Sequence, residues 1–175
     1  PFRADHVGSL LRPPELKQAR DDFKNKKIPR ERLKEIEDQH IRKAVAMQEA
    51  AGLQSATDGE FRRAFWHVDF LTGFEGIVAT QSQYALKFHG EGGAESETRS
   101  MMVVKSKVRR TRPVMLEHFR FLREATGKTA KLCIPSPSML HFRGGRGSVN
   151  QEAYPDIAEF FSDLARIYRE EVADL

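Results

Sequence analysis

The sequence of 175 residues contains a single cysteine, Cys133, and no apolar run near the length of a membrane span. One cysteine cannot form a disulfide within the chain, which is usual for proteins of reducing compartments. Crossing a bilayer takes about 20 consecutive apolar residues, so no membrane-spanning helix is expected. The sequence also opens without the basic and then apolar segment of a signal peptide. We therefore expect a cytoplasmic protein without a membrane partner.

A large excess of charge of one sign is also absent, because the formal net charge is only +4. A local cluster of basic residues is present at Lys105, Lys107, Arg109, Arg110 and Arg112. A solvated strand face is the favoured interpretation of this basic patch, and a landing surface for a polyanion is the alternative. Few aromatic residues alternate with these cations to stack on bases, so no specific nucleic-acid partner is expected.

Hydrophobic residues make up 39% of the chain and charged residues 31%, which is typical of one globular domain. Apolar periodicity and Gly or Pro signals predict strands over residues 2–9, 53–57 and 129–134, and helices over 14–24, 29–51, 113–126 and 154–175. Strands that alternate with helices in this order favour a parallel sheet with helices on its faces. Residues 1–175 are therefore expected to form a single α/β domain with about three core strands.

Residues 77–110 differ from this alternation of strands and helices. Tyr84, Leu86 and Phe88 alternate with smaller or charged residues, and the same pattern returns near Met102 and Val104. Such alternation is typical of half-buried strands. The sequence thus predicts a β-hairpin inserted after the second strand, with a tip rich in glycine and glutamate at 90–100.

Charged residues gather directly after the expected strand 53–57. Asp58, Glu60, Arg62 and Arg63 fall within six positions, around Gly59. In α/β proteins the carboxyl ends of strands are where ligands bind. The two acids could accept hydrogen bonds from an ammonium group, and the arginines could clamp a carboxylate. An acidic turn with an internal ion pair is the alternative, because structural ion pairs mimic sites.

Two further segments carry candidate residues. Gly8 and Ser9 follow the expected first strand and could present backbone N–H groups to an anion. His6 could act as a base or ligand, although a histidine hydrogen-bonded within a turn is the favoured interpretation. Trp66 lies in an aromatic-rich segment, 64–71, that could line a pocket for a flat heterocycle. A short amphipathic helix that fills the core is favoured for that segment.

Two motifs resemble the cobalamin-independent methionine synthase family, and its shorter, single-barrel branch is the nearer match. They are Phe-Arg-Ala-Asp-His-Val-Gly-Ser-Leu-Leu-Arg-Pro at 2–13 and Thr-Asp-Gly-Glu-Phe-Arg-Arg at 57–63, with weaker support from 134–139. The resemblance implies a (β/α)8 TIM barrel, of which this chain would be the N-terminal part. It also implies a 5-methyltetrahydropteroyltriglutamate–homocysteine S-methyltransferase-like enzyme. Such an enzyme transfers a methyl group from methyl-tetrahydrofolate to homocysteine or a related thiol.

The resemblance also suggests roles for individual residues. Gly8 and Ser9 match the first-strand turn that contacts the amino acid's polar end, and Glu60 matches the acid that receives the homocysteine ammonium. Ser136 matches the third-strand loop beside the folate site. Asp58 replaces the histidine common in the longer enzymes, which leaves the substrate open. The predicted substrate-binding residues are His6, Gly8, Ser9, Asp58, Glu60, Arg62, Trp66 and Ser136. No residue is assigned a catalytic role.

The family's catalytic zinc is bound by a histidine, two cysteines and a glutamate on later strands, and Cys133 matches none of them. Zinc ligands are therefore expected beyond residue 175, with none in this segment. An open edge after the third strand would be covered by further chain or by a second copy. The alternatives are a barrel of the same fold that acts on a different thiol or acid, and a non-catalytic basic binding domain.

Overall fold

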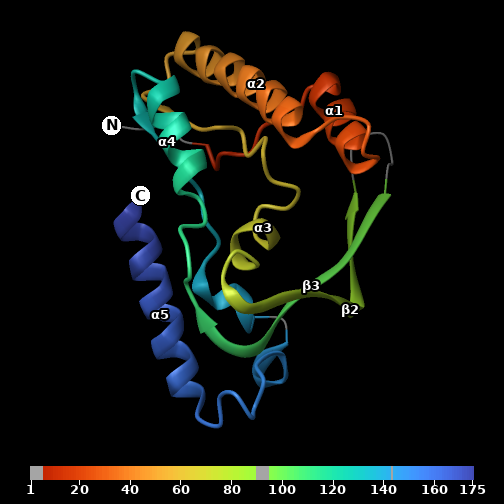
Figure 1. The fold of residues 1–175 in the computed structure, drawn as a ribbon, viewed down its shortest axis with the longest axis vertical. Helices are drawn as coiled ribbons and strands as arrows, with labels where there is room; N and C mark the ends of the chain where they lie inside the picture. Colours follow the sequence, from red (N-terminus) through yellow and green to blue (C-terminus); the bar gives the residue numbers. More distant parts are fainter. Residues whose placement is uncertain (1–5, 90–94, 143) are drawn as a thin grey trace. The chain divides into compact units, whose positions relative to one another are not determined.

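The computed structural model describes residues 6–89, 95–142 and 144–175. The chain divides into two compact units. The first unit contains the residues up to 66 with 115–134 and 175, and the second contains 67–114 and 135–174. Each unit combines helices with a two-stranded sheet (Figure 1). The chain is therefore mixed α/β, as predicted, whereas the closed barrel and the single domain stay predictions.

Helices α1 (Pro14–Lys24), α2 (Arg30–Ala50) and α4 (Leu116–Ala125) belong to the first unit. The bounds of α1 and α2 agree with the predicted helices within one residue because local signals set them, whereas α4 begins three residues after its predicted start. Pro14 opens α1, where a missing backbone N–H costs nothing. Pro29 precedes α2, and Gly52 follows it with a φ of 82°, a left-handed conformation that suits glycine.

The sheet of the first unit is shorter than predicted. Strand β1 (Ser55–Ala56) pairs in parallel with β4 (Thr129–Ala130), each with two residues. The predicted first strand is wrong over its described part, 6–9, and residues 2–5 lie outside the described residues. Side chains occupy the carbonyls that a ladder would use: Lys131 donates to His6, Cys133 to Val7 and Thr57 to Gly8.

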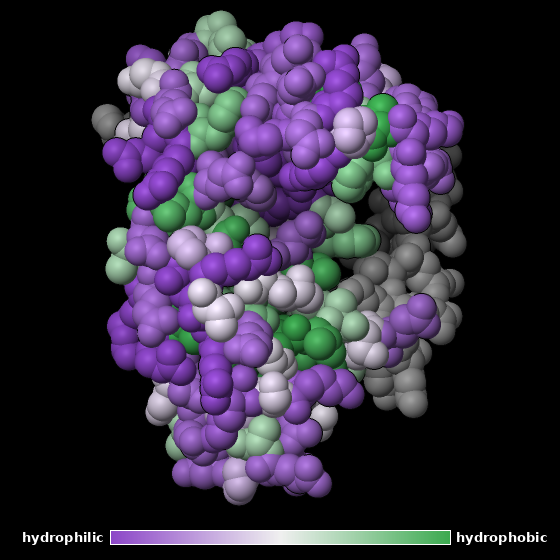
Figure 2. All heavy atoms as spheres, viewed as in Figure 1, coloured by the Kyte–Doolittle hydropathy of each residue, from purple (hydrophilic) through white to green (hydrophobic). Residues whose placement is uncertain are grey.

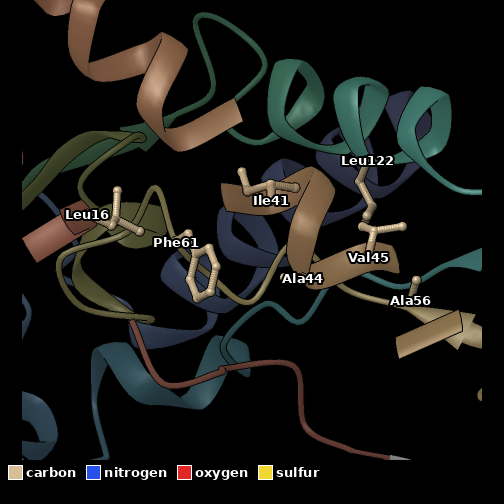
Figure 3. Packing of buried hydrophobic residues seen from close by; sticks show 7 residues of the cluster. All are labelled: Leu16, Ile41, Ala44, Val45, Ala56, Phe61 and Leu122. Atoms are coloured by element: carbon tan, nitrogen blue, oxygen red, sulfur yellow. The ribbon is translucent and has the colours of Figure 1, made fainter. Parts of the chain in front are cut away.

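The apolar core of the first unit joins the helices to the strand and to the turn after it. Its buried residues, shown in Figure 3, are Leu16, Ile41, Ala44, Val45, Ala56, Phe61 and Leu122. Phe61 belongs to the acidic turn predicted to be the site. Because its ring packs in this core, the turn is anchored to α1 and α2 rather than free in solvent.

The second unit contains the predicted antiparallel strands. Strand β2 (Glu75–His89) pairs with β3 (Glu95–Arg109), with Val78 opposite Val103. The register shifts between Glu75 and Ile77 and between Gln81 and Leu86. Of the predicted tip, 95–100 belong to β3 instead, and 90–94 lie outside the described residues. That this pair is an insertion in a barrel stays a prediction.

The remaining elements of the second unit are α3 (Val68–Leu71), the 3-10 helices η2 (Pro137–Leu140) and η3 (Gly145–Ser148), and α5 (Ile157–Asp174). The rings of Phe70, Phe74 and Tyr168 form its aromatic core, with Phe70 and Phe74 edge to face at 5.2 Å between centroids. Helix α5 is thereby packed against the segment around α3 within this unit.

Two cations of the basic patch are neutralised within the second unit. Lys107 pairs with Glu159, and Arg110 pairs with Glu171 and Asp174 of α5. Lys105, Arg109 and Arg112 stay exposed. The patch is thus less cationic than its sequence indicates, which favours the solvated-face interpretation.

The surface drawn in Figure 2 and the helices can be compared with the composition of the chain. On the face drawn in Figure 2, hydrophilic residues predominate and apolar residues show in small separate groups. Within the described ranges, no helix combines the length and the apolar character that crossing a bilayer requires.

Candidate functional site

The chain turns sharply directly after β1, at Asp58-Gly59-Glu60-Phe61. Both Gly59 (φ 64°) and Glu60 (φ 57°) adopt the left-handed conformation. A Cβ atom at Gly59 would lie 2.8 Å from the Phe61 ring, so the turn requires glycine there. Asp58 Oδ1 accepts a hydrogen bond from the Glu60 N–H at 2.9 Å. A left-handed non-glycine residue is strained by about 1–2 kcal/mol, and such strain is concentrated at functional sites.

The two acids of the turn are buried with little hydrogen bonding to their carboxylates. Asp58 is 2% exposed and Glu60 is 6% exposed. The Glu60 carboxylate forms an ion pair with Arg63 at 3.7 Å and accepts no hydrogen bond among the described residues. Asp58 Oδ2 is buried without a hydrogen-bond donor in the described chain. Buried acids with unused acceptor atoms can accept hydrogen bonds from a cationic group.

Burial raises the pKa of the Glu60 carboxyl above its usual range. The charge of Arg63 opposes this shift most strongly, Asp58 adds to the rise, and Arg12 lowers the pKa again. Desolvation disfavours the ionised form, and an added positive charge favours it. A ligand ammonium group beside Glu60 would therefore be stabilised by the same carboxylate that it helps to ionise.

The two arginines of the turn point to different partners. Arg62 pairs with Asp38 of α2 and lies over the Phe121 ring, with its Cζ 4.4 Å from the ring centroid. Arg63 is 1% exposed, and its Nη1 donates to the carbonyl of Cys133 at 2.7 Å. The predicted internal ion pair thus exists only between Arg63 and Glu60. A substrate-binding role for Arg62 stays a prediction.

The N-terminal segment lies directly beside the acidic turn, which brings Gly8 and Ser9 to the candidate site. Thr57 Oγ1 donates to the Gly8 carbonyl at 2.8 Å, and the Leu10 N–H donates to the Gly59 carbonyl at 3.1 Å. Gly8 has a φ of 130° and is buried, whereas Ser9 is exposed. The predicted contact of these residues with an anion stays a prediction.

The buried Gln48 of α2 contacts both His6 of the N-terminal segment and Thr57, which precedes the acidic turn. The distance between His6 Nε2 and Gln48 Oε1 is 2.7 Å, so His6 is hydrogen-bonded as favoured, but to a residue of α2 and not within a turn. Gln48 Nε2 also donates to the Thr57 carbonyl at 2.9 Å, and its Oε1 accepts from the Thr57 N–H at 3.0 Å. Sequence reasoning missed Gln48, although a polar residue next to the apolar positions of α2 was a visible signal.

His118 of α4 is a second residue that sequence reasoning missed. Burial lowers its pKa below the usual range, and the charge of Arg62 lowers it further, whereas Asp58 raises it. The imidazole therefore belongs to the same electrostatic environment as the acidic turn. Its only sequence signal was a histidine among the apolar residues of a helix.

Trp66 and Ser136 are the two candidate residues that lie outside the acidic turn and the N-terminal segment beside it. The favoured interpretation of 64–71 as a short helix that fills the core is confirmed at α3, where Phe70 and Leu71 are buried. It is wrong for Phe65 and Trp66, which are 50% and 46% exposed. Ser136 belongs to the second unit, where its Oγ accepts a hydrogen bond from the Ser138 N–H at 3.4 Å. Its part in a shared site stays a prediction.

The described residues do not fit a zinc ion. In residues 6–89, 95–142 and 144–175, no three His, Cys, Asp or Glu side chains are grouped to hold a metal. Cys133 Sγ donates to the Val7 carbonyl. A structural or catalytic zinc takes three or four such ligands.

Comparison with known proteins supplies relatives for this fold and site. No protein-family model matches the chain. The uncharacterized protein YxjH of Bacillus subtilis is 39% identical over 173 residues, which cover 98% of this chain and 44% of that protein. The 5-methyltetrahydropteroyltriglutamate–homocysteine methyltransferase of Thermotoga maritima is 25% identical over 99% of this chain and 22% of its own length.

Solved structures show the same fold. A candidate vitamin-B12-independent methionine synthase from Listeria monocytogenes matches 99% of this chain and 48% of its own, with a TM-score of 0.78 and 36% identity. A B12-independent methionine synthase from Shewanella sp. W3-18-1, solved with selenomethionine, matches 85% of this chain and 40% of its own, with a TM-score of 0.60. At 21% identity, the second likeness shows the fold alone.

The mixed α/β fold of this chain thus resembles parts of structures solved as B12-independent methionine synthases. Its homologues are cobalamin-independent methionine synthase-like proteins, which confirms the resemblance inferred from the two motifs. The chain spans less than half the length of these relatives.

Proposed function

We propose that this chain contributes the amino-acid-binding part of a methyltransferase of the cobalamin-independent methionine synthase type. The enzyme would transfer a methyl group from a methyl-tetrahydrofolate to homocysteine or a related thiol. The observation that supports the proposal is Glu60, a buried residue with a strained backbone whose carboxylate accepts no hydrogen bond within the described chain. An ammonium group supplies the hydrogen bonds that this carboxylate lacks and adds a positive charge to that of Arg63.

The residues of the turn have distinct roles in this proposal. Glu60 binds the ammonium group of the amino acid, and Asp58 provides the second negative charge beside it. The backbone of Gly8 and Ser9, tied to the turn through Thr57, faces the amino acid's polar end. Zinc would hold the substrate thiol as a thiolate, which is the nucleophile. Since the described residues hold no zinc site, this chain's share is to bind and orient the amino acid.

The test measures amino-acid binding by the protein as its native gene encodes it. Calorimetric titration with L-homocysteine and L-methionine should show binding that Glu60→Gln weakens by about 1.5–3 kcal/mol, the range for a hydrogen bond to a charged group. Glu124→Gln is the matched control, because Glu124 is exposed on α4 of the same unit. Unchanged affinity of the folded Glu60→Gln variant would remove Glu60 from the site. Methyl transfer from methyl-tetrahydrofolate to homocysteine is then measured directly.

A barrel of the same fold with a different thiol or acid substrate is the second candidate. Asp58 favours it, because this buried acid stands where the longer enzymes commonly have a histidine. Thiol acids with and without an amino group separate the two candidates. A thiol acid that lacks the amino group should compete poorly if Glu60 recognises ammonium. Equal competition would favour the second candidate.

A further inference from the structure

The backbone of the acidic turn is held by an arginine that lies 48 positions earlier in the chain. Arg12 Nη2 donates to the carbonyl of Glu60 at 2.8 Å and to the carbonyl of Arg63 at 2.6 Å. One guanidinium group therefore bridges both ends of the Glu60–Arg63 segment. The Arg63 N–H also donates to the Glu60 carbonyl at 3.1 Å, so Arg12 closes a turn that is already hydrogen-bonded.

The local sequence restricts the backbone conformation of Arg12. Arg12 precedes Pro13 and Pro14, and a residue before proline is restricted to extended conformations. Pro13 caps α1, with its carbonyl accepting from the N–H groups of Leu16 and Lys17. The start of α1 thus fixes the direction from which Arg12 reaches the turn.

The charge of Arg12 is not neutralised by a neighbouring acid. In the described part of the chain, Arg12 forms no ion pair, whereas Arg20 pairs with Glu37 and Arg62 with Asp38. Its positive charge is therefore available to the acids of the turn. Carbonyl acceptors satisfy its hydrogen bonds without removing its charge.

We propose that Arg12 is a positioning residue for Glu60. Its guanidinium holds the Glu60 backbone in the left-handed conformation, which directs the carboxylate at the ammonium group of an amino-acid ligand, and its charge favours the ionised carboxylate. This inference rests on the proposed function above. Arg12 is not a catalytic residue, because its hydrogen bonds go to the protein backbone.

The charged groups around Glu60 determine the sign of the expected pH effect. Arg63 and Arg12 lower the pKa of Glu60, and Asp58 raises it together with burial. In the adjoining N-terminal segment, the His6 ring contacts Gln48 of α2, and Lys131 donates to the His6 carbonyl. Loss of the Arg12 charge must raise the pKa of Glu60, so ammonium binding is lost at a higher pH on acidification.

The test uses L-methionine, whose thioether does not titrate, and the protein as its native gene encodes it. Arg12→Gln should weaken binding about tenfold or more at pH 7 and move the acid midpoint of binding to higher pH. Arg12→Lys keeps the charge without the planar fork, so it should weaken binding with a midpoint nearer to that of the original protein. Arg32→Gln is the control, since Arg32 is exposed on α2 and pairs only with the exposed Glu35.

Three outcomes separate this inference from the proposed function. If the original protein does not bind L-methionine or L-homocysteine, the proposed function fails. If Arg12→Gln binds with unchanged affinity, or loses affinity with an unchanged midpoint, Arg12 is a structural clamp only and the inference fails. The inference can also be tested without a ligand, by following the titration of the Glu60 carboxyl with carbon NMR. The pKa of Glu60 must be higher in Arg12→Gln than in the original protein.

Discussion

Substitution of Gly59 by alanine tests whether the acidic turn depends on glycine for two separable reasons. The left-handed φ of 64° strains any side chain by about 1–2 kcal/mol. The new Cβ would also meet Phe61 ring carbons at 2.8, 3.0 and 3.1 Å, which forces a buried ring to move. Overpacking of this kind costs about 1–3 kcal/mol. We therefore expect Gly59→Ala to lower the free energy of unfolding by about 2–5 kcal/mol.

Two other glycines separate the two contributions. Gly52 has a φ of 82° with nothing within 4 Å of a Cβ, so Gly52→Ala should lower the free energy of unfolding by the strain alone, about 1–2 kcal/mol. Gly127 has neither a positive φ nor a close neighbour. Gly127→Ala should stabilise the protein by about 0.4–1 kcal/mol, because alanine restricts the unfolded chain.

Urea unfolding followed by circular dichroism gives the free energy of unfolding of the three variants. The fluorescence of Trp66, three residues after Arg63, reports on unfolding close to the turn. Gly59→Ala should also weaken amino-acid binding, since the moved turn displaces Glu60. If Gly59→Ala destabilises no more than Gly52→Ala, the contact with Phe61 has no effect and the account of the turn is wrong.

Three further predictions concern the second unit. Tyr154→Phe removes the hydroxyl that donates to Asp163 and accepts from the Val108 N–H, and should lower the free energy of unfolding by about 1–3 kcal/mol in urea unfolding. Burial raises the pKa of Tyr154 to about 12 from 10.0, so its contribution to the free energy of unfolding is present below pH 10 and is lost as the pH rises towards 12. If the free energy of unfolding of Tyr154→Phe falls equally steeply between pH 10 and 12, this account is wrong. Glu171→Gln should lower the free energy of unfolding by about 3 kcal/mol, because it breaks the buried pair with Arg110. The half-buried neighbour Glu170 pairs with Arg166 near the surface, so Glu170→Gln should cost about 1 kcal/mol or less in the same assay. The basic patch should bind duplex DNA more weakly than about 10⁻⁸ M at physiological salt, and tighter binding would restore the polyanion alternative.

The helices were predictable from sequence because their ends are set by neighbouring residues. Helix α1 begins at Pro14 and ends at Lys24, at the predicted bounds. The strands were predicted too long because a strand is defined by its partner. The residues of 6–9 look extended in sequence, yet their carbonyls are taken by Thr57, Lys131 and Cys133, which no local pattern indicates.

The sequence by itself determined the position of the acidic turn, because Asp58, Gly59 and Glu60 directly follow a buried strand and match a family motif. Only the tertiary structure decided which residues support that turn. It pairs Arg62 with Asp38, leaves the Glu60 carboxylate without a hydrogen bond in the described chain, and brings Arg12 to the carbonyls of Glu60 and Arg63. Such contacts join residues that are 24 to 51 positions apart. Packing of α1 and α2 against the turn creates them, and a sequence pattern with a period of two or 3.6 residues carries no information on contacts at that range.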